Sequence, residues 1–151
     1  MLAPALNWHF IDMDSYIEKK EGRTIADIFA SEGEIFFRQL ENQALQNIAS
    51  MEDVVVATGG GAPCFLNNMQ LMNDSGLTIY LKVAPEELFQ RVRMGKTERP
   101  LLAGKSDDEL LTYIREKLEE REPWYQQAME TADSGLWGVE HYLSIVEKYL
   151  K

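Results

Sequence analysis

The 151-residue sequence contains a single cysteine, Cys64, and no apolar run near the roughly 20 residues that a membrane helix needs. One cysteine cannot form an intrachain disulfide, and it cannot build a zinc site alone, so both a disulfide scaffold and a zinc module are excluded. Residues 1–5 lack the charged start and the long apolar stretch of a signal peptide. The sequence therefore predicts a soluble, cytoplasmic protein with no membrane partner.

Basic side chains are also scarce, since 15 Lys and Arg stand against 25 Asp and Glu, which gives a net charge of −10. A nucleic-acid-binding surface is basic, so no nucleic-acid partner is expected. Residues 91–105 are the exception, with five basic residues and one acid, Glu98. This cationic segment indicates either a site for a small anion such as a phosphate or a solvated loop, and composition leaves both open.

Three short apolar runs predict strands, at residues 8–12, 54–58 and 78–83. Helical patterns lie between and after them. The helices are expected at residues 15–22, 24–33, 35–48, 85–93, 106–122 and 139–150, the fifth ending before Pro123; residues 129–138 show no convincing strand. Strands that alternate with helices predict an α/β domain, in which a parallel sheet is covered by helices on both faces. Ligands of such sheets bind at the carboxyl ends of the strands.

Two of the three expected strands end in residues that are suited to catalysis or ligand binding. Asp12 and Asp14 end the first, and three glycines, Gly59, Gly60 and Gly61, follow the second. The carboxylates could hold Mg²⁺ through water and accept a hydroxyl proton, although Asp14 could instead cap the next helix. The glycines would let a ligand approach the backbone and would leave amide donors uncovered.

Three arginines each allow a functional and a structural interpretation. Arg38 could point into the cleft as a planar carboxylate clamp or extend from an apolar helix face into water. Arg99, inside the cationic segment between Gly95 and Gly104, fits a phosphate-facing lid or an ordinary surface loop. Arg121 could bind a ligand or complement the dipole of its helix.

Six motifs in this order resemble the shikimate kinase family, over residues 7 to 125. They are Phe10-Ile11-Asp12-Met13-Asp14, Ala26-Asp27-Ile28-Phe29, Gly33-Glu34 with Phe37-Arg38 and Glu41, Thr58-Gly59-Gly60-Gly61-Ala62-Pro63, Arg99-Pro100-Leu101-Leu102 and Arg121-Glu122-Pro123-Trp124-Tyr125. The resemblance implies a P-loop kinase-like three-layer sandwich. It also implies transfer of the ATP γ-phosphoryl group to the 3-hydroxyl of shikimate, in the route to chorismate and the aromatic amino acids.

The resemblance assigns a role to each candidate residue. Asp14 would bind the shikimate hydroxyls and orient or deprotonate the attacking one, and Asp12 would help to place Mg²⁺. Arg38 and Arg121 would grip the shikimate carboxylate beside the backbone of Gly59, Gly60 and Gly61. Arg99 would meet the transferred phosphate of ATP from a lid at about residues 94–105. Phe29 and Phe37 would be walls of the substrate-binding region, residues 13–41, with Glu41 and Pro100 as further supports.

One motif of such kinases is absent, because the sequence contains no Gly-x-x-x-x-Gly-Lys-Ser/Thr phosphate loop. Residues 95–97 and 104–106 match only its last three positions. By resemblance, we expect residues 1–151 to be one N-terminally incomplete domain and a monomer. The first, central strand of its sheet, between the strands at Val54 and Thr78, would then be missing, and the chain as given would be inactive. Two alternatives are a non-catalytic shikimate-binding or regulatory relative and a gluconate- or nucleotide-kinase-like enzyme.

Overall fold

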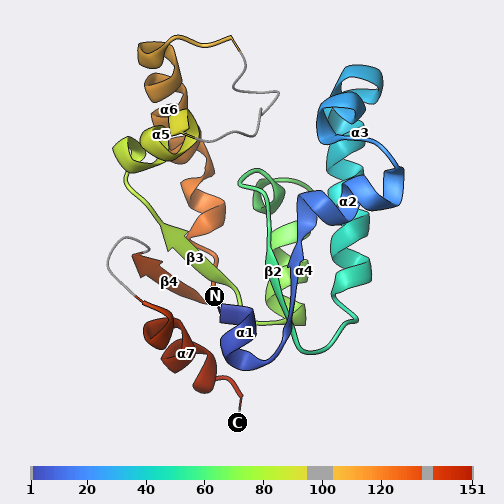
Figure 1. Ribbon diagram of the computed structural model, residues 1–151, viewed down its shortest axis with the longest axis vertical. Helices are drawn as coiled ribbons and strands as arrows, with labels where there is room; N and C mark the ends of the chain where they lie inside the picture. Colours follow the sequence, from blue (N-terminus) through green and yellow to red (C-terminus); the bar gives the residue numbers. More distant parts are fainter. Residues whose placement is uncertain (1, 95–103, 134–137, 151) are drawn as a thin grey trace.

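The structure is a computed structural model that describes residues 2–94, 104–133 and 138–150 (Figure 1). Helices and strands alternate over most of this length, as the sequence predicts. In chain order the elements are α1 (Leu2–Leu6), β1 (His9–Asp12), α2 (Met13–Glu21), α3 (Ile25–Ile48), β2 (Val54–Ala57), the 3-10 turn η1 (Ala62–Cys64), α4 (Asn68–Ser75), β3 (Ile79–Lys82), α5 (Pro85–Met94), α6 (Asp107–Tyr125), β4 (Glu130–Asp133) and α7 (Val139–Glu147).

The strands form two parallel pairs. β1 pairs with β2 in the register Asp12 to Ala57, and β3 pairs with β4 in the register Lys82 to Asp133. The α/β class with parallel strands is therefore confirmed. β4 corrects the expectation that residues 129–138 contain no strand. Its sequence, Glu-Thr-Ala-Asp, has no apolar run, and it forms because its backbone pairs with β3 and buries Ala132.

Side-chain caps and glycines set the helix ends. The Asp12 carboxylate caps α2, which begins at Met13 and not at Ser15 as expected, and Gly22 ends this helix in the left-handed conformation. Thr24 caps α3, which Gly33 interrupts at φ 86, between the two helices expected there. The expectation that α6 ends at Glu122 is wrong, because Pro123 lies inside the helix, where it removes one hydrogen bond, and the last turn continues to Tyr125.

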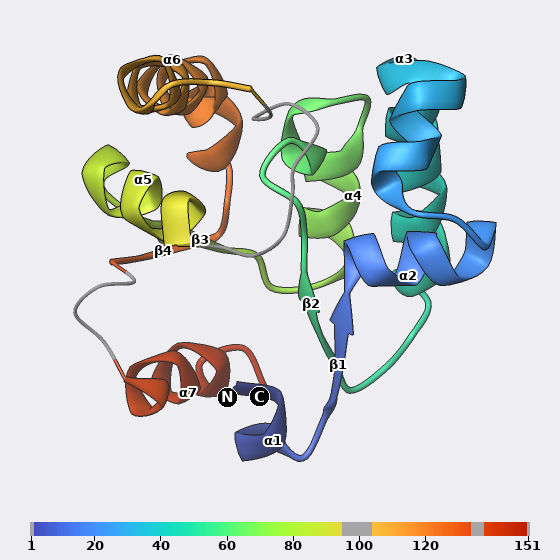
Figure 2. The ribbon, with the colours of Figure 1, turned by 45° about the horizontal axis from the view of Figure 1, so that its top comes forward.

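One hydrophobic core supports β1, α2, α3 and η1. Its buried members are Met13, Ile17, Ile28, Phe37, Ala44, Leu45, Ile48 and Ala62. α2 packs on α3, and β1 with β2 runs beside them, so the ends of both strands and the middle of α3 meet above this core (Figure 2). No helix in the parts of the chain that the structure describes is long and apolar enough to span a membrane.

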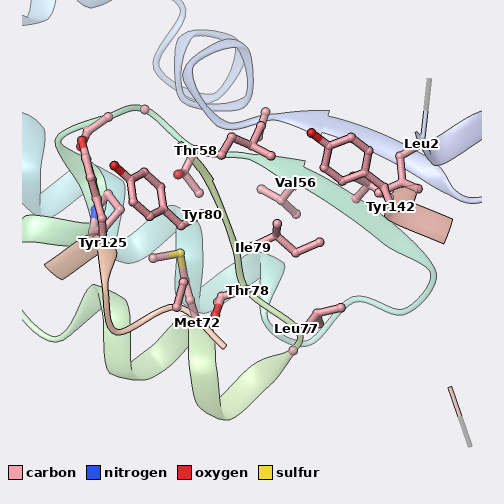
Figure 3. Close-up of a pocket in the computed structure, with 18 of the residues that line it drawn as sticks. Leu2, Val56, Thr58, Met72, Leu77, Thr78, Ile79, Tyr80, Tyr125 and Tyr142 are labelled. Atoms are coloured by element: carbon pink, nitrogen blue, oxygen red, sulfur yellow. The ribbon is translucent and has the colours of Figure 1, made fainter. Parts of the chain in front are cut away.

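A cleft of about 1090 Å³ separates the two strand pairs (Figure 3). Val56 and Thr58 from the β2 segment and Ile79 and Tyr80 from β3 line it, and across residues 2–94, 104–133 and 138–150 no strand pairing joins β2 to β3. The cleft lies where the resemblance predicts a central strand.

Candidate active site

Asp14 lies against the glycine turn that follows β2. Because β1 and β2 are parallel and Asp12 is level with Ala57, Asp14 and Gly59 both come two residues beyond the paired ends. A Cβ built on Gly59 would lie 3.6 Å from Asp14 Oδ1 and 3.7 Å from Glu41 Oε2. The two predicted strand ends therefore meet, and Glu41 of α3 adds a second carboxylate beside the same backbone segment.

Asp12 has a structural task in addition to the metal role that the resemblance implies. Its Oδ1 accepts hydrogen bonds from the amides of Asp14 (3.0 Å) and Ser15 (3.3 Å), so Asp12, not Asp14, caps α2. Among the described residues no three His, Cys, Asp or Glu side chains are grouped closely enough to hold a metal. Mg²⁺ commonly keeps several waters and binds through one or two carboxylates with substrate phosphates, and Asp12 fits that limited contribution.

Arg38 is buried on α3, with 7% of its surface exposed, so it does not extend into water. Its Nη1 donates to Glu41 Oε1 at 2.7 Å, and its Nη2 donates to Glu34 Oε1 at 3.1 Å. Its guanidinium carbon lies 4.3 Å from the centre of the Phe65 ring. The Arg38 Nε–H is buried and has no hydrogen-bond partner within the described chain. A buried donor without a partner is costly, so this group stands out among the side chains around the turn.

The turn carries glycine at position 61 because Arg38 occupies the space of a side chain. A Cβ on Gly61 would lie 2.7 Å from Arg38 Nη2 and 2.8 Å from Arg38 Nη1, closer than a real Cβ approaches another atom. The guanidinium therefore rests directly on the backbone of this residue. This contact gives a steric reason for one of the three glycines that the sequence singled out.

The far side of the turn is held by a buried asparagine. Asn68, which is fully buried, donates from Nδ2 to the Ala62 carbonyl at 2.8 Å. Its Oδ1 accepts from Asn42 Nδ2 on α3 at 2.7 Å. The segment after the glycines is thus tied to the helix that carries Arg38, which fixes their relative positions. Nothing in the sequence pattern had singled out Asn42 or Asn68.

Arg121 reaches the same turn from the end of α6. A Cβ on Gly60 would lie 3.1 Å from Arg121 Nη1 and 3.3 Å from Tyr125 Oη. The Tyr125 hydroxyl donates a hydrogen bond to the Gly60 carbonyl oxygen. Burial raises the pKa of the Cys64 thiol, while nearby Arg121 and Arg38 lower it. The two predicted clamp arginines therefore approach one turn from different helices.

Aromatic rings pack beside Arg38 and beside Tyr125. The rings of Phe29 and Phe37 are 4.9 Å apart, and Arg38 lies 5.4 Å from the Phe37 ring. Tyr80 packs on Tyr125 at 5.0 Å. Phe29 and Phe37 were singled out by resemblance, whereas Phe65 and Tyr80 were missed, because a lone aromatic residue after a turn or within a strand gives no sequence signal. Arg99 and Pro100, with residues 95–103 of the expected lid, lie outside the described residues.

The hydrogen bond from Tyr125 to the Gly60 carbonyl should stabilise the junction between α6 and the turn. We expect Tyr125→Phe to lower the free energy of unfolding by about 0.5–1.5 kcal/mol, the net contribution of one such bond. Urea denaturation measures this change. Tyr16→Phe on α2 is the matched control and should change stability less. Equal stability of Tyr125→Phe and the wild type would show that the bond contributes nothing.

Burial raises the pKa of the Glu41 carboxyl above its ordinary value of 4.5, and the nearby Asp14 raises it further, although Arg38 opposes both. A carboxyl with a raised folded-state pKa adds stability below its unfolded pKa and loses that contribution as the pH rises through the folded pKa. We therefore expect the wild type to lose stability relative to Glu41→Gln as the pH rises above 4.5.

Urea denaturation over a pH series measures the difference in unfolding free energy between the wild type and Glu41→Gln. Glu116→Gln, on the exposed surface of α6, is the matched control and should show no such trend. If the difference instead grew in favour of the wild type with rising pH, the Glu41 pKa would be lowered by Arg38, contrary to our expectation.

The family model described as shikimate kinase matches residues 1–136. The chain belongs to the shikimate kinase family. The shikimate kinase of Bacteroides fragilis is 50% identical over 127 residues, which are 84% of this chain and 71% of that protein.

Two solved shikimate kinase structures resemble the whole chain. The structure from Bacteroides thetaiotaomicron matches with a TM-score of 0.89 and 42% identity. The match covers 99% of this chain and 87% of that one. The structure from Acinetobacter baumannii, in complex with shikimate, matches with a TM-score of 0.88 and 34% identity. This match covers 99% of this chain and 85% of that one. Membership of this family confirms the resemblance seen in the sequence and disfavours a gluconate- or nucleotide-kinase-like enzyme.

Proposed function

We propose that the turn at Gly59–Gly61 and the side chains around it form a shikimate site in this chain. The observation that carries the proposal is the buried Arg38 guanidinium, which rests on Gly61 and has an Nε–H without a partner in the described residues. A planar guanidinium is suited to a carboxylate, which it can bind through two parallel hydrogen bonds. Arg121, on the other side of the turn, supplies the second cation.

Asp14 is the candidate for the hydroxyl side of the substrate. It lies beside Gly59, at the mouth of the turn, where its carboxylate can accept a proton from a hydroxyl group or orient that group. With the substrate carboxylate held by Arg38 and Arg121, the 3-hydroxyl of shikimate would be presented to Asp14. Positioning of this kind supplies much of the catalysis in phosphoryl transfer, since that reaction needs little covalent chemistry from the protein.

The phosphate donor finds less support in this chain. The 151 residues contain no phosphate loop of the Gly-x-x-x-x-Gly-Lys-Ser/Thr type, so no cradle for the ATP phosphates can be assigned. ATP would supply the phosphoryl group, and Asp12 would help to hold Mg²⁺ beside Asp14. The role of Arg99 against the transferred phosphate stays a prediction, as do the monomeric state and the cytoplasmic location.

A second candidate function follows from the same sequence fact. A chain that has a shikimate site but no phosphate loop would bind shikimate without phosphorylating it. We propose this for the 151-residue polypeptide by itself, while its family is one of ATP-dependent kinases.

Calorimetry and an assay of ADP release test these proposals together on the 151-residue chain. We expect one shikimate to bind per chain and no ADP release that depends on shikimate. ADP release would overturn the proposed inactivity and leave the shikimate site in place. A folded chain that bound no shikimate would overturn the site itself.

A further inference from the structure

Phe65 follows the 3-10 turn η1 and lies against the Arg38 guanidinium. The guanidinium carbon is 4.3 Å from the centre of the Phe65 ring and 5.4 Å from that of Phe37, the residue before Arg38 on α3. A cation within about 6 Å of the face of an aromatic ring is attracted by the negative charge of that face. Phe65 is the nearer of the two rings, and it comes from a separate segment of the chain.

The backbone holds Phe65 in place from both sides. The Cys64 amide donates to the Gly61 carbonyl at 3.0 Å, and the Asn68 amide donates to the Phe65 carbonyl at 3.2 Å. Between them Leu66 has φ 51, a left-handed conformation that is uncommon for leucine. Such a conformation persists where the surrounding contacts determine it, and here Asn68 is fully buried. The backbone of Phe65 is therefore fixed by contacts that do not involve the guanidinium.

The ring and two carboxylates restrain the guanidinium in different directions. Glu41 and Glu34 accept hydrogen bonds from Nη1 and Nη2, which point along the plane of the group. Phe65 lies over the guanidinium carbon, so it opposes tilting out of that plane. The buried Nε–H, which has no partner within the described chain, thereby keeps a fixed direction.

A defined plane matters for the ligand that this arginine is proposed to bind. A carboxylate that is held through two parallel hydrogen bonds needs a guanidinium in one orientation. An apolar ring also excludes water from one side of the charge, and an ion pair is stronger where water is excluded. None of the six sequence motifs includes Phe65.

We propose that Phe65 is a positioning residue, whose ring fixes the plane of the Arg38 guanidinium and strengthens its interaction with the carboxylate of the ligand. The proposal rests on the shikimate site proposed above. It assigns to Phe65 an effect on affinity through Arg38, in addition to packing.

Three variants of the 151-residue chain test the proposal. Phe65→Leu removes the ring but keeps an apolar side chain, and Phe65→Tyr keeps the ring. Phe36→Leu is the matched control, because Phe36 is a half-buried ring on α3 that packs against the hydrophobic core. Circular dichroism establishes that each variant is folded. Calorimetry measures binding of shikimate and of its uncharged methyl ester. The NMR order parameter of Arg38 Nε in the ligand-free chain measures how firmly the side chain is held.

We expect Phe65→Leu to weaken shikimate binding by roughly 3-fold to 30-fold, the range that corresponds to a cation–π contact. Binding of the ester should weaken by less than about twofold, because the ester has no charge for the arginine to recognise. Phe65→Tyr and Phe36→Leu should bind shikimate within about twofold of the wild type. The order parameter of Arg38 Nε should fall from about 0.8 to below about 0.6 in Phe65→Leu and stay high in the other two variants.

Three results would overturn the proposal. One is shikimate affinity in Phe65→Leu equal to that of the wild type. Another is equal weakening of acid and ester, because the ring would then act only through general packing. The third is an unchanged order parameter of Arg38 Nε in Phe65→Leu. This last measurement needs no ligand, so it tests Phe65 even if the wild type binds no shikimate, the result that would instead refute the proposed site.

Discussion

Replacement of Arg38 by alanine should weaken shikimate binding by roughly 2–5 kcal/mol, which is about 30-fold to about 5,000-fold in Kd. The guanidinium is buried, is oriented by Glu41 and Glu34, and carries an Nε–H that has no partner in the described residues. When one member of a buried charge pair is removed, most of the energetic penalty comes from the partner charge that stays buried without compensation. Calorimetry with shikimate measures the change.

Two further variants separate binding from stability. Arg38→Lys keeps the charge but loses the planar fork, so it should also bind shikimate weakly. Arg23→Ala removes a more exposed arginine that contacts Ser31 and Glu32, and its shikimate affinity should match that of the wild type. Circular dichroism establishes that each variant is folded before titration. If folded Arg38→Ala bound shikimate as tightly as the wild type, the role of Arg38 as a carboxylate clamp would be refuted.

Gly61→Ala should weaken shikimate binding almost as much as loss of the arginine. The added Cβ would lie 2.7 Å from Arg38 Nη2, which is too close. Because Arg38 has a long, flexible side chain, its guanidinium would move away from the turn. Arg38 can do so only by leaving its contact with Glu41, at 2.7 Å, and its place over the Phe65 ring. Overpacking of this kind typically costs about 1–3 kcal/mol, and the displaced arginine would no longer meet the ligand.

Gly76→Ala is the matched control for this substitution. Gly76 follows α4 with extended backbone, and a Cβ there would meet nothing within 4 Å. Its stability should change by no more than about 0.5 kcal/mol, with shikimate affinity unchanged. Calorimetry and urea denaturation of the two alanine variants give the comparison. Equal shikimate affinity in Gly61→Ala and Gly76→Ala would contradict the close contact between Arg38 and the turn.

The sequence predicted most of the fold because most elements carry a local signal. β1, β2 and β3 are apolar runs, and α3 and α6 begin directly after the capping residues Thr24 and Ser106, at the positions where helices were expected to start. β4 has no such signal, since the pairing of its backbone with β3 determines its conformation. Likewise, local preference suggested that α6 would end before Pro123, whereas its last turn continues to Tyr125.

The charged residues and glycines of the candidate site could be predicted from the sequence, but the residues that hold them in place could not. Asp14, Arg38, Arg121 and the glycine turn have recognisable chemistry at strand ends and on helices. The buried Asn68, which ties the turn to α3, and Phe65 under the Arg38 guanidinium have none. Their contribution depends on contacts between segments distant in sequence, which only the folded structure shows.

We propose that Arg38 and Arg121 recognise the carboxylate of shikimate from two sides of the Gly59–Gly61 turn. Calorimetric titration of the wild-type chain with shikimate and with its uncharged methyl ester measures how much the carboxylate contributes to binding. We predict that the ester binds at least about tenfold more weakly, since a charged hydrogen-bonded pair contributes about 1.5–3 kcal/mol. Equal affinity for the acid and the ester would show that the two arginines do not recognise the carboxylate.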